Sequence, residues 1–202
     1  MSLKHAILAV LLDGEASGYD LGKRFDLSIA NFWHALPQHL YQELARMEDD
    51  GLVDGAAVLQ ERRPNKRVYS ITQLGRKELN RWLGEPSRVT APKSDLLVRI
   101  YAADVADTEA MCADIERQLE QHRAKLQAYE ALRSAFFGDR TEEEYVQTTS
   151  RVGPYMTLRR GIMYETENIT WCEWAMGVLR DRAQNGARMP ASSQAGGAGR
   201  DA

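Results

Sequence analysis

The spacing of hydrophobic residues in the first part of the chain predicts three short helices. Residues 3–12 are apolar on most sides, as expected of a helix buried in a small domain. Ser17 precedes Asp20 by three residues, which resembles a capping box and predicts the start of a second helix. The third helix is predicted from residue 37, because apolar residues at i, i+4 and i+7 share one face. These residues are Leu40, Leu44 and Met47.

The residues after the third helix predict a β-hairpin. Gly51 stands where a helix ends in a left-handed residue. Two strand-like runs follow, residues 53–60 and 67–71, and the turn between them contains Pro64, Asn65 and several cations. A helix, a glycine stop and a basic hairpin in this order predict a winged helix-turn-helix.

The second half of the chain is helical throughout by its hydrophobic pattern. Ser94 is expected to cap one helix, and Asp107 or Thr108 to start a much longer one. In the longer helix apolar residues alternate between steps of four and three, the pattern of a coiled-coil seam. At 1.5 Å per residue it would span roughly 45 Å, too long for the core of so small a domain. The pattern therefore predicts an interface with a second copy of the chain. The residues expected there are Ile115, Leu119, Leu126, Trp171 and Trp174, although both tryptophans equally suit the core of their own domain.

A last long helix is predicted to start at Thr141, which has Glu144 three residues on, and to run to about residue 183. Gly153 and Pro154 are expected to kink it. The fold class predicted is mainly α, with an N-terminal winged helix-turn-helix and a C-terminal long-helix dimerisation domain. The expected divisions are residues 1–86 for DNA binding, 94–183 for dimerisation and 185–202 as a disordered tail.

Composition narrows the class of protein. Of 202 residues, 44% are hydrophobic and 27% charged, as in ordinary soluble proteins. No stretch approaches the roughly 20 apolar residues of a membrane span, so we expect a cytoplasmic protein without a membrane partner. Cys112 and Cys172 are far apart and match no metal spacing, and we interpret them as small buried residues.

The sequence offers little support for catalysis. Its four histidines are scattered over separate predicted elements. There is no G-x-S-x-G motif, no P-loop and no glycine-rich dinucleotide fingerprint. We therefore expect no enzymatic activity, no metal site and no cofactor.

A net charge of −3 counts against indiscriminate coating of nucleic acid but not against sequence-specific binding, which needs only a local basic patch. Arginine pairs with guanine, glutamine with adenine, and tyrosine donates to phosphate. The alternatives are a solvated helix face and a solubilising loop. The candidate DNA-binding residues are Tyr19, Gln38, Tyr41, Gln42 and Arg46, with Arg62, Arg63, Lys66 and Arg67 on the wing.

Aromatic residues with a few polar neighbours suggest a cavity for a small aromatic acid. The alternative is ordinary packing in the core and the interface. The candidate effector-binding residues are Trp33, His34, Tyr101, Tyr155, Met156, Arg159 and Tyr164.

Several segments resemble the PadR-type transcriptional regulators, named for the repressor of phenolic-acid decarboxylase. LKHAILAVLLDGEASGYDLGKRF resembles the family opening, and LYQELARMEDDGLV its reading helix and stop. RRPNKRVYSITQLGRKELNRWL resembles the wing and the following helix, with Arg62 where the family usually has glycine and Asn65 for aspartate. GPYMTLRRGIMYETENITWCEWAM resembles the C-terminal helix of the branch with a long, wholly helical second domain.

The resemblance implies a homodimer that binds a palindromic double-stranded DNA operator and represses a nearby promoter. In many members a small aromatic or phenolic molecule releases the repression. Two other classes stay open at this point. One is a small-molecule (multidrug) binding protein, and the other is a helical dimerisation scaffold whose winged helix contacts protein.

Overall fold

The computed structural model describes residues 3–28, 37–58, 66–87 and 93–185. The chain divides into two compact units, Met1–Thr90 and Ala91–Ala202. The tail predicted at 185–202 lies outside the described residues, apart from Asn185.

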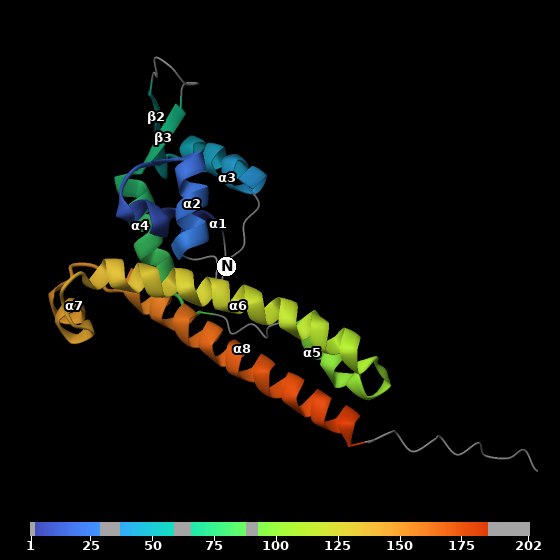
Figure 1. The fold of residues 1–202 in the computed structure, drawn as a ribbon. Helices are drawn as coiled ribbons and strands as arrows, with labels where there is room; N and C mark the ends of the chain where they lie inside the picture. The colour runs from blue at the N-terminus through green and yellow to red at the C-terminus, as the bar shows by residue number, and fades with distance from the viewer. Residues whose placement is uncertain (1–2, 29–36, 59–65, 88–92, 186–202) are drawn as a thin grey trace, which may run out of the picture. The chain divides into compact units, whose positions relative to one another are not determined.

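The first unit has the elements of a winged helix, and β2 and β3 extend from its helices as the wing (Figure 1). The three helices and both strands predicted from the sequence are present, while residues 59–60 of the first strand and the turn predicted at Pro64 and Asn65 lie outside the described residues. The elements are α1 (Leu3–Val10), the 3₁₀ turn η1 (Leu11–Asp13), β1 (Ala16–Ser17), α2 (Gly18–Ser28), α3 (Pro37–Asp49), β2 (Val53–Val58), β3 (Lys66–Ile71) and α4 (Gln73–Leu83).

The sheet of this unit contains one strand that the sequence does not predict. Its order is β1-β3-β2 and both pairings are antiparallel. Tyr69 on β3 lies between Ala16 of β1 and Gly55 of β2, and its side chain is buried. Strand β1 escapes prediction because two residues are too few to show alternation.

The core of the first unit fixes the orientation of α3. Leu40, Leu44 and Met47 are 3%, 0% and 1% exposed and pack with residues of α1 and α2, including Ile7 and Leu21. The helix ends at Gly51, which adopts φ 70° and lets the Leu52 amide bond back to the Met47 carbonyl. The apolar face and the glycine stop predicted from the sequence are thus confirmed.

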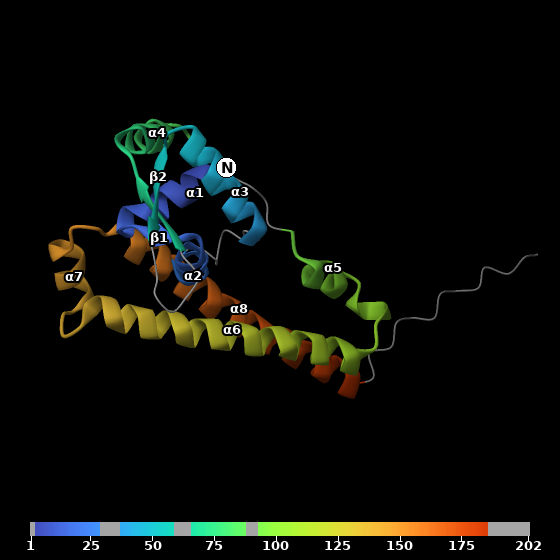
Figure 2. The ribbon, with the colours of Figure 1, turned by 90° about the horizontal axis from the view of Figure 1, so that it is seen from above.

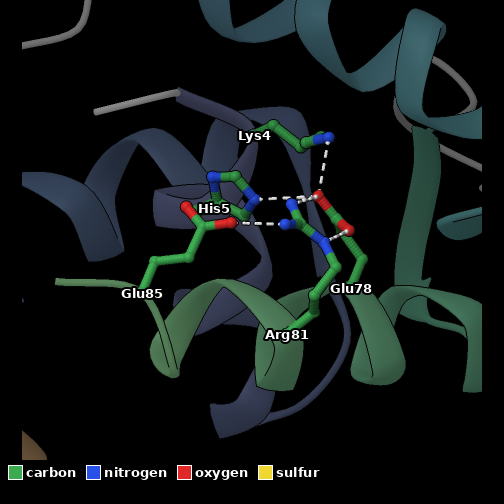
Figure 3. Close-up of polar contacts among 5 residues, drawn as sticks. All are labelled: Lys4, His5, Glu78, Arg81 and Glu85. Atoms are coloured by element: carbon green, nitrogen blue, oxygen red, sulfur yellow. Dashed lines mark hydrogen bonds and ion pairs between the residues drawn. The ribbon is translucent and has the colours of Figure 1, made fainter.

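A charged network ties α1 to α4 on the same unit (Figure 3). The Glu78 carboxylate accepts hydrogen bonds from Arg81 at 2.8 and 3.0 Å and from His5 Nε2 at 3.1 Å, and Lys4 Nζ lies 3.0 Å away. The His5 ring also stacks on Trp82, with the centroids 4.6 Å apart. Hydrogen bonds from Arg81, then Lys4 and His5, hold the pKa of Glu78 well below its usual range.

Replacing Glu78 by glutamine is expected to lower the free energy of unfolding at pH 7 by about 1 kcal/mol, a modest value because water screens a partly exposed carboxylate. Since the folded-state pKa is depressed, this stability is present above the ordinary value of 4.5 and is lost as pH falls below it. Urea unfolding of both proteins at pH 7 and from pH 5 to 3 measures the difference, which should shrink with acidity. A difference in unfolding free energy that did not change with pH would contradict an electrostatic origin of this stability. Glu85→Gln, which changes an exposed member of the same network, is the control.

The second unit is built on two long antiparallel helices, α6 and α8, that lie side by side (Figures 1 and 2). Helix α7 lies at one end of the pair and α5 at the other. Asp107 caps α6 by accepting from the Ala110 amide at 2.7 Å, as predicted. The elements are α5 (Asp95–Tyr101), the 3₁₀ turn η2 (Ala103–Val105), α6 (Thr108–Phe137), α7 (Glu142–Thr148) and α8 (Gly153–Gln184).

The single kinked helix predicted from Thr141 is wrong, because the chain breaks into α7 and α8. Thr141 and Glu144 do form the expected capping box. The helix stops at Thr148, however, and Thr149 is extended. A proline inside a continuing helix loses a hydrogen bond and clashes with the preceding turn. Pro154 instead stands in the first turn of α8, where its missing N–H costs nothing.

A hydrogen-bonded histidine–glutamate pair lies in the seam between α6 and α8. Glu165 of α8 is 1% exposed, and its Oε2 lies 2.5 Å from Nδ1 of His122 on α6. Apolar residues such as Ile115 and Cys172 fill the same seam. The described structure therefore places a hydrogen-bonded polar pair beside the apolar core of the contact between α6 and α8.

Candidate nucleic-acid interface

Helix α3 turns a polar face to solvent, because its apolar residues are held in the core. The Arg46 side chain is 76% exposed, and Glu43 Oε2 lies 3.7 Å from its guanidinium. Such a face presents donors and acceptors for base edges and phosphates. The sequence-predicted residues that the structure exposes together on α3 are Gln38, Tyr41, Gln42 and Arg46.

The start of α2 lies against this face. The Tyr41 ring fills the space beside Gly18, where an added Cβ would meet Tyr41 Cε1 at 2.3 Å. Next to it, Tyr19 is 64% exposed and Lys23 Nζ lies 4.7 Å from its ring centroid. The predicted candidate Tyr19 is thus accessible, and Lys23 adds a cation that the sequence did not single out.

The start of β3, next to the turn of the wing, carries two cations, each paired with a carboxylate from a helix. Arg67 donates to Glu48 of α3, and this bond raises the pKa of the guanidinium. Lys66 Nζ lies 3.7 Å from Oδ2 of Asp20 on α2. The Ser17 hydroxyl donates to the Asp20 carboxylate at 2.7 Å, which lowers the pKa of Asp20. Neither pair was predicted, since ladder register and helix packing bring these residues together.

The remaining wing candidates, Arg62 and Arg63, lie outside the described residues. Gly55 is the local signal that sequence reasoning missed. A glycine inside a strand often marks a place where another group approaches closely. Here that group is the Arg67–Glu48 pair.

The candidate effector residues point in different directions. Tyr155 is 2% exposed and packs on Phe136, Phe137 and Tyr145, so it fills the junction of α6, α7 and α8. Met156 and Tyr164 are exposed on α8, and Arg159 pairs with Glu142 of α7. Tyr101 is 92% exposed and, with Leu97 and Val98, lines an open groove of about 800 Å³ on α5. Trp33 and His34 lie outside the described residues.

The candidate interface residues fall into two groups. Ile115 and Leu119 are 0% and 3% exposed against the chain's own α8, so they have no surface left for a partner. The α6 seam was expected to need a second copy, but α8 fills it. Leu126 and Trp171 are half-buried, and Trp174 is 63% exposed.

Within the described residues, no group of histidine, cysteine, aspartate and glutamate side chains is arranged to hold a metal ion. None of the described helices has the length and apolar character needed to cross a membrane.

Two family models match the chain. Residues 7–81 match the one described as Transcriptional regulator PadR-like family, and residues 92–180 match Virulence activator alpha C-term. The Probable transcriptional regulator Rv1176c of Mycobacterium tuberculosis is 32% identical over 192 residues, which are 90% of this chain and 100% of that protein. This chain belongs to the PadR-like family of transcriptional regulators. The resemblance noted in the sequence is confirmed.

Solved structures of two bacterial regulators share the fold. PadR of Bacillus subtilis in complex with operator DNA matches with a TM-score of 0.71 at 24% identity, over 88% of this chain and 98% of that one. The Vibrio cholerae virulence activator AphA matches with a TM-score of 0.64 at 28% identity, over 89% and 99%. By sequence, the Bacillus subtilis negative transcriptional regulator PadR is 27% identical over 183 residues, 88% of this chain and 97% of that protein. That protein is also known in complex with p-coumaric acid.

Proposed function

We propose that this PadR-like regulator binds a palindromic operator as a homodimer and represses transcription from it. The observation that carries the proposal is the exposed face of α3, which presents Gln38, Tyr41, Gln42 and Arg46 from a helix anchored in the core. In helix-turn-helix docking the second helix enters the major groove and its first turns read base edges. Tyr19 at the start of α2 and Lys66 beside Asp20 of the same helix are exposed and suit phosphate. Repression is supported by the relative from Bacillus subtilis, a negative regulator.

An apolar stripe on α8 supports the homodimer. Met163, Trp174 and Val178 are 58%, 63% and 38% exposed. At 100° per residue they fall on one side of the helix, away from Glu165 and Cys172, which face α6. Exposed tryptophan and methionine are typical of interface centres. Two winged helices related by a two-fold axis would then meet half-sites one helical turn apart, about 34–36 Å.

We also propose that a small aromatic acid releases the regulator from DNA. The support is the complex of the Bacillus subtilis relative with p-coumaric acid. Control would work by a population shift, in which the ligand binds better to the conformation whose half-sites are wrongly spaced. Operator binding would weaken by that same difference in affinity.

A mobility-shift titration on the DNA upstream of its own coding sequence tests the proposal, with and without a panel of phenolic acids. We expect a specific shift whose affinity rises steeply as the salt concentration falls. One of the phenolic acids should release the protein from the DNA. Arg46→Ala should cost about 1–3 kcal/mol at one base pair if the side chain reads guanine. Arg180→Ala, which removes an exposed arginine from α8, is the matched control and should bind like the unmodified protein.

Each outcome of the titration has a distinct meaning. A shift that no phenolic releases keeps the regulator and overturns the aromatic effector. An equal loss by Arg46→Ala on every DNA sequence would mean that Arg46 holds phosphate instead of reading a base. No specific shift at low salt would overturn DNA binding and leave a helical scaffold whose winged helix contacts protein.

A further inference from the structure

The side chain of Arg67 runs back across the wing toward α3. Arg67 of β3 stands opposite Ala57 of β2, and Gly55 is the diagonal neighbour on the same face of the sheet. The guanidinium donates to the carboxylate of Glu48 near the end of α3. A Cβ on Gly55 would lie 2.5 Å from Arg67 Nε and 2.6 Å from Glu48 Oε1. The Arg67–Glu48 pair therefore crosses directly over this glycine.

The neighbouring cation, Lys66, is held in a different way. Adjacent residues of a strand point to opposite faces, so Lys66 meets α2 while Arg67 meets α3. Lys66 stays 3.7 Å from Asp20, beyond hydrogen-bond distance, and Asp20 already accepts from Ser17. Lys66 is thus available to a phosphate at little cost. Arg67 would first have to give up a hydrogen-bonded carboxylate.

We propose that Arg67 and Glu48, closing over Gly55, form a lock that sets the angle of the wing against α3. Arg67 is then a positioning residue for DNA recognition and not a phosphate contact. The lock joins β3 to the same helix that presents Gln42 and Arg46, so the wing and the reading face reach DNA as one rigid surface. A preformed surface binds without the entropic cost of ordering the wing. This inference rests on the proposed DNA-binding function.

The dependence of DNA affinity on salt separates the two roles, because each lost phosphate contact lowers the slope by about 1. The double variant Glu48→Gln/Arg67→Gln keeps the net charge and removes the lock. Gly55→Ala displaces the lock without touching any charge, and the atoms it displaces are ends of flexible side chains. Lys66→Gln is the matched control, a single charge removed from the adjacent position.

We expect Glu48→Gln/Arg67→Gln and Gly55→Ala to bind about two- to fivefold more weakly, the worth of an exposed ion pair, with the salt slope unchanged. Lys66→Gln should lower the slope by about 1. Hydrogen exchange of the β2 and β3 amides, measured without DNA, should speed up in both lock variants and stay unchanged in Lys66→Gln.

Three results would overturn the lock. One is a slope that falls as much in Glu48→Gln/Arg67→Gln as in Lys66→Gln, since Arg67 would then contact phosphate. Another is unmodified affinity in Gly55→Ala. The third is unchanged exchange of the wing amides in both lock variants. If the unmodified protein binds no DNA, the proposed function fails by itself, and faster exchange would still establish the lock as a feature of the fold.

Discussion

Replacing His122 by leucine is expected to lower the free energy of unfolding of the second unit by about 3 kcal/mol or more, because it leaves a buried carboxylate without its partner. Glu165 is 1% exposed, and in the described structure its carboxylate lies 2.5 Å from Nδ1 of His122. Apolar residues of α6 and α8 line the seam beside it, so a lone carboxylate there would be poorly solvated. Hydrogen exchange of α6 and α8 peptides measures the loss in this unit separately from the winged helix.

The neighbouring residue supplies a matched control for this prediction. Arg123 of α6 also bonds across to α8, where Glu173 accepts at 2.6 Å. Both side chains are about half exposed, at 57% and 50%. Arg123→Leu should therefore cost less than about 1 kcal/mol, as exposed ion pairs usually do. The two substitutions differ mainly in the burial of the carboxylate that each leaves behind.

Replacing both members of the buried pair distinguishes the cost of leaving Glu165 unpaired from the cost of losing the whole pair. His122→Leu/Glu165→Leu should recover most of the lost stability, because apolar residues of similar volume often replace a buried pair at no cost. If His122→Leu were as mild as Arg123→Leu, the carboxylate would have found solvent or another partner. The buried pair would then contribute nothing specific to the α6–α8 seam.

Replacing Gly75 by alanine is expected to destabilise the first unit by about 3 kcal/mol, at the upper end for overpacking, because backbone blocks the added methyl group. A Cβ there would lie 2.2 Å from the Leu52 carbonyl oxygen and 3.0 Å from Ile71 Cγ1. The first turn of α4 is docked on this carbonyl through the Thr72 amide at 3.1 Å. The Thr72 hydroxyl also donates to the Gly51 carbonyl at 2.7 Å. Urea unfolding and exchange of α1 and α4 peptides measure the effect.

A second glycine of the same unit provides the control. Gly22 lies within α2, and the nearest atom to an added Cβ is Leu40 Cδ2 at 4.0 Å, an ordinary contact. Gly22→Ala should therefore be neutral or stabilise by up to about 1 kcal/mol, since alanine favours a helix over glycine. If Gly75→Ala and Gly22→Ala had equal effects, the approach of α4 to the Leu52 carbonyl would not limit the size of the residue at position 75.

The elements that sequence reasoning found are those whose cause is local. Leu40, Leu44 and Met47 share a face by helical spacing alone, and they are buried as predicted. Gly51 ends α3 because few other residues adopt its positive φ. Asp107 and Thr141 cap their helices through hydrogen bonds that span only three residues. From these signals the chain's mainly α winged-helix fold follows, whereas its PadR-like membership rests on the resemblance of whole segments and on the matching family model and relative.

Long-range contacts explain what sequence reasoning missed. The coiled-coil seam of α6 was assigned to a second copy, since periodicity shows that a face is covered but not by what. In the structure the chain's own α8 covers it, with Cys172 and Met176 in the seam. The kink expected at Pro154 became a break, because Thr149 leaves the helix and proline then suits a new first turn. Strand β1 exists only through its pairing with β3.

The sequence by itself determined where α3 lies and which of its residues face away from the core, because helical period and caps are properties of consecutive residues. Only the tertiary structure decided which charges meet. Glu48 and Arg67 are 19 residues apart, and His122 and Glu165 are 43 apart. Such pairs depend on ladder register and helix packing, which no local pattern encodes. The ion pair between the wing and α3 and the buried His122–Glu165 pair of the second unit are therefore products of the fold.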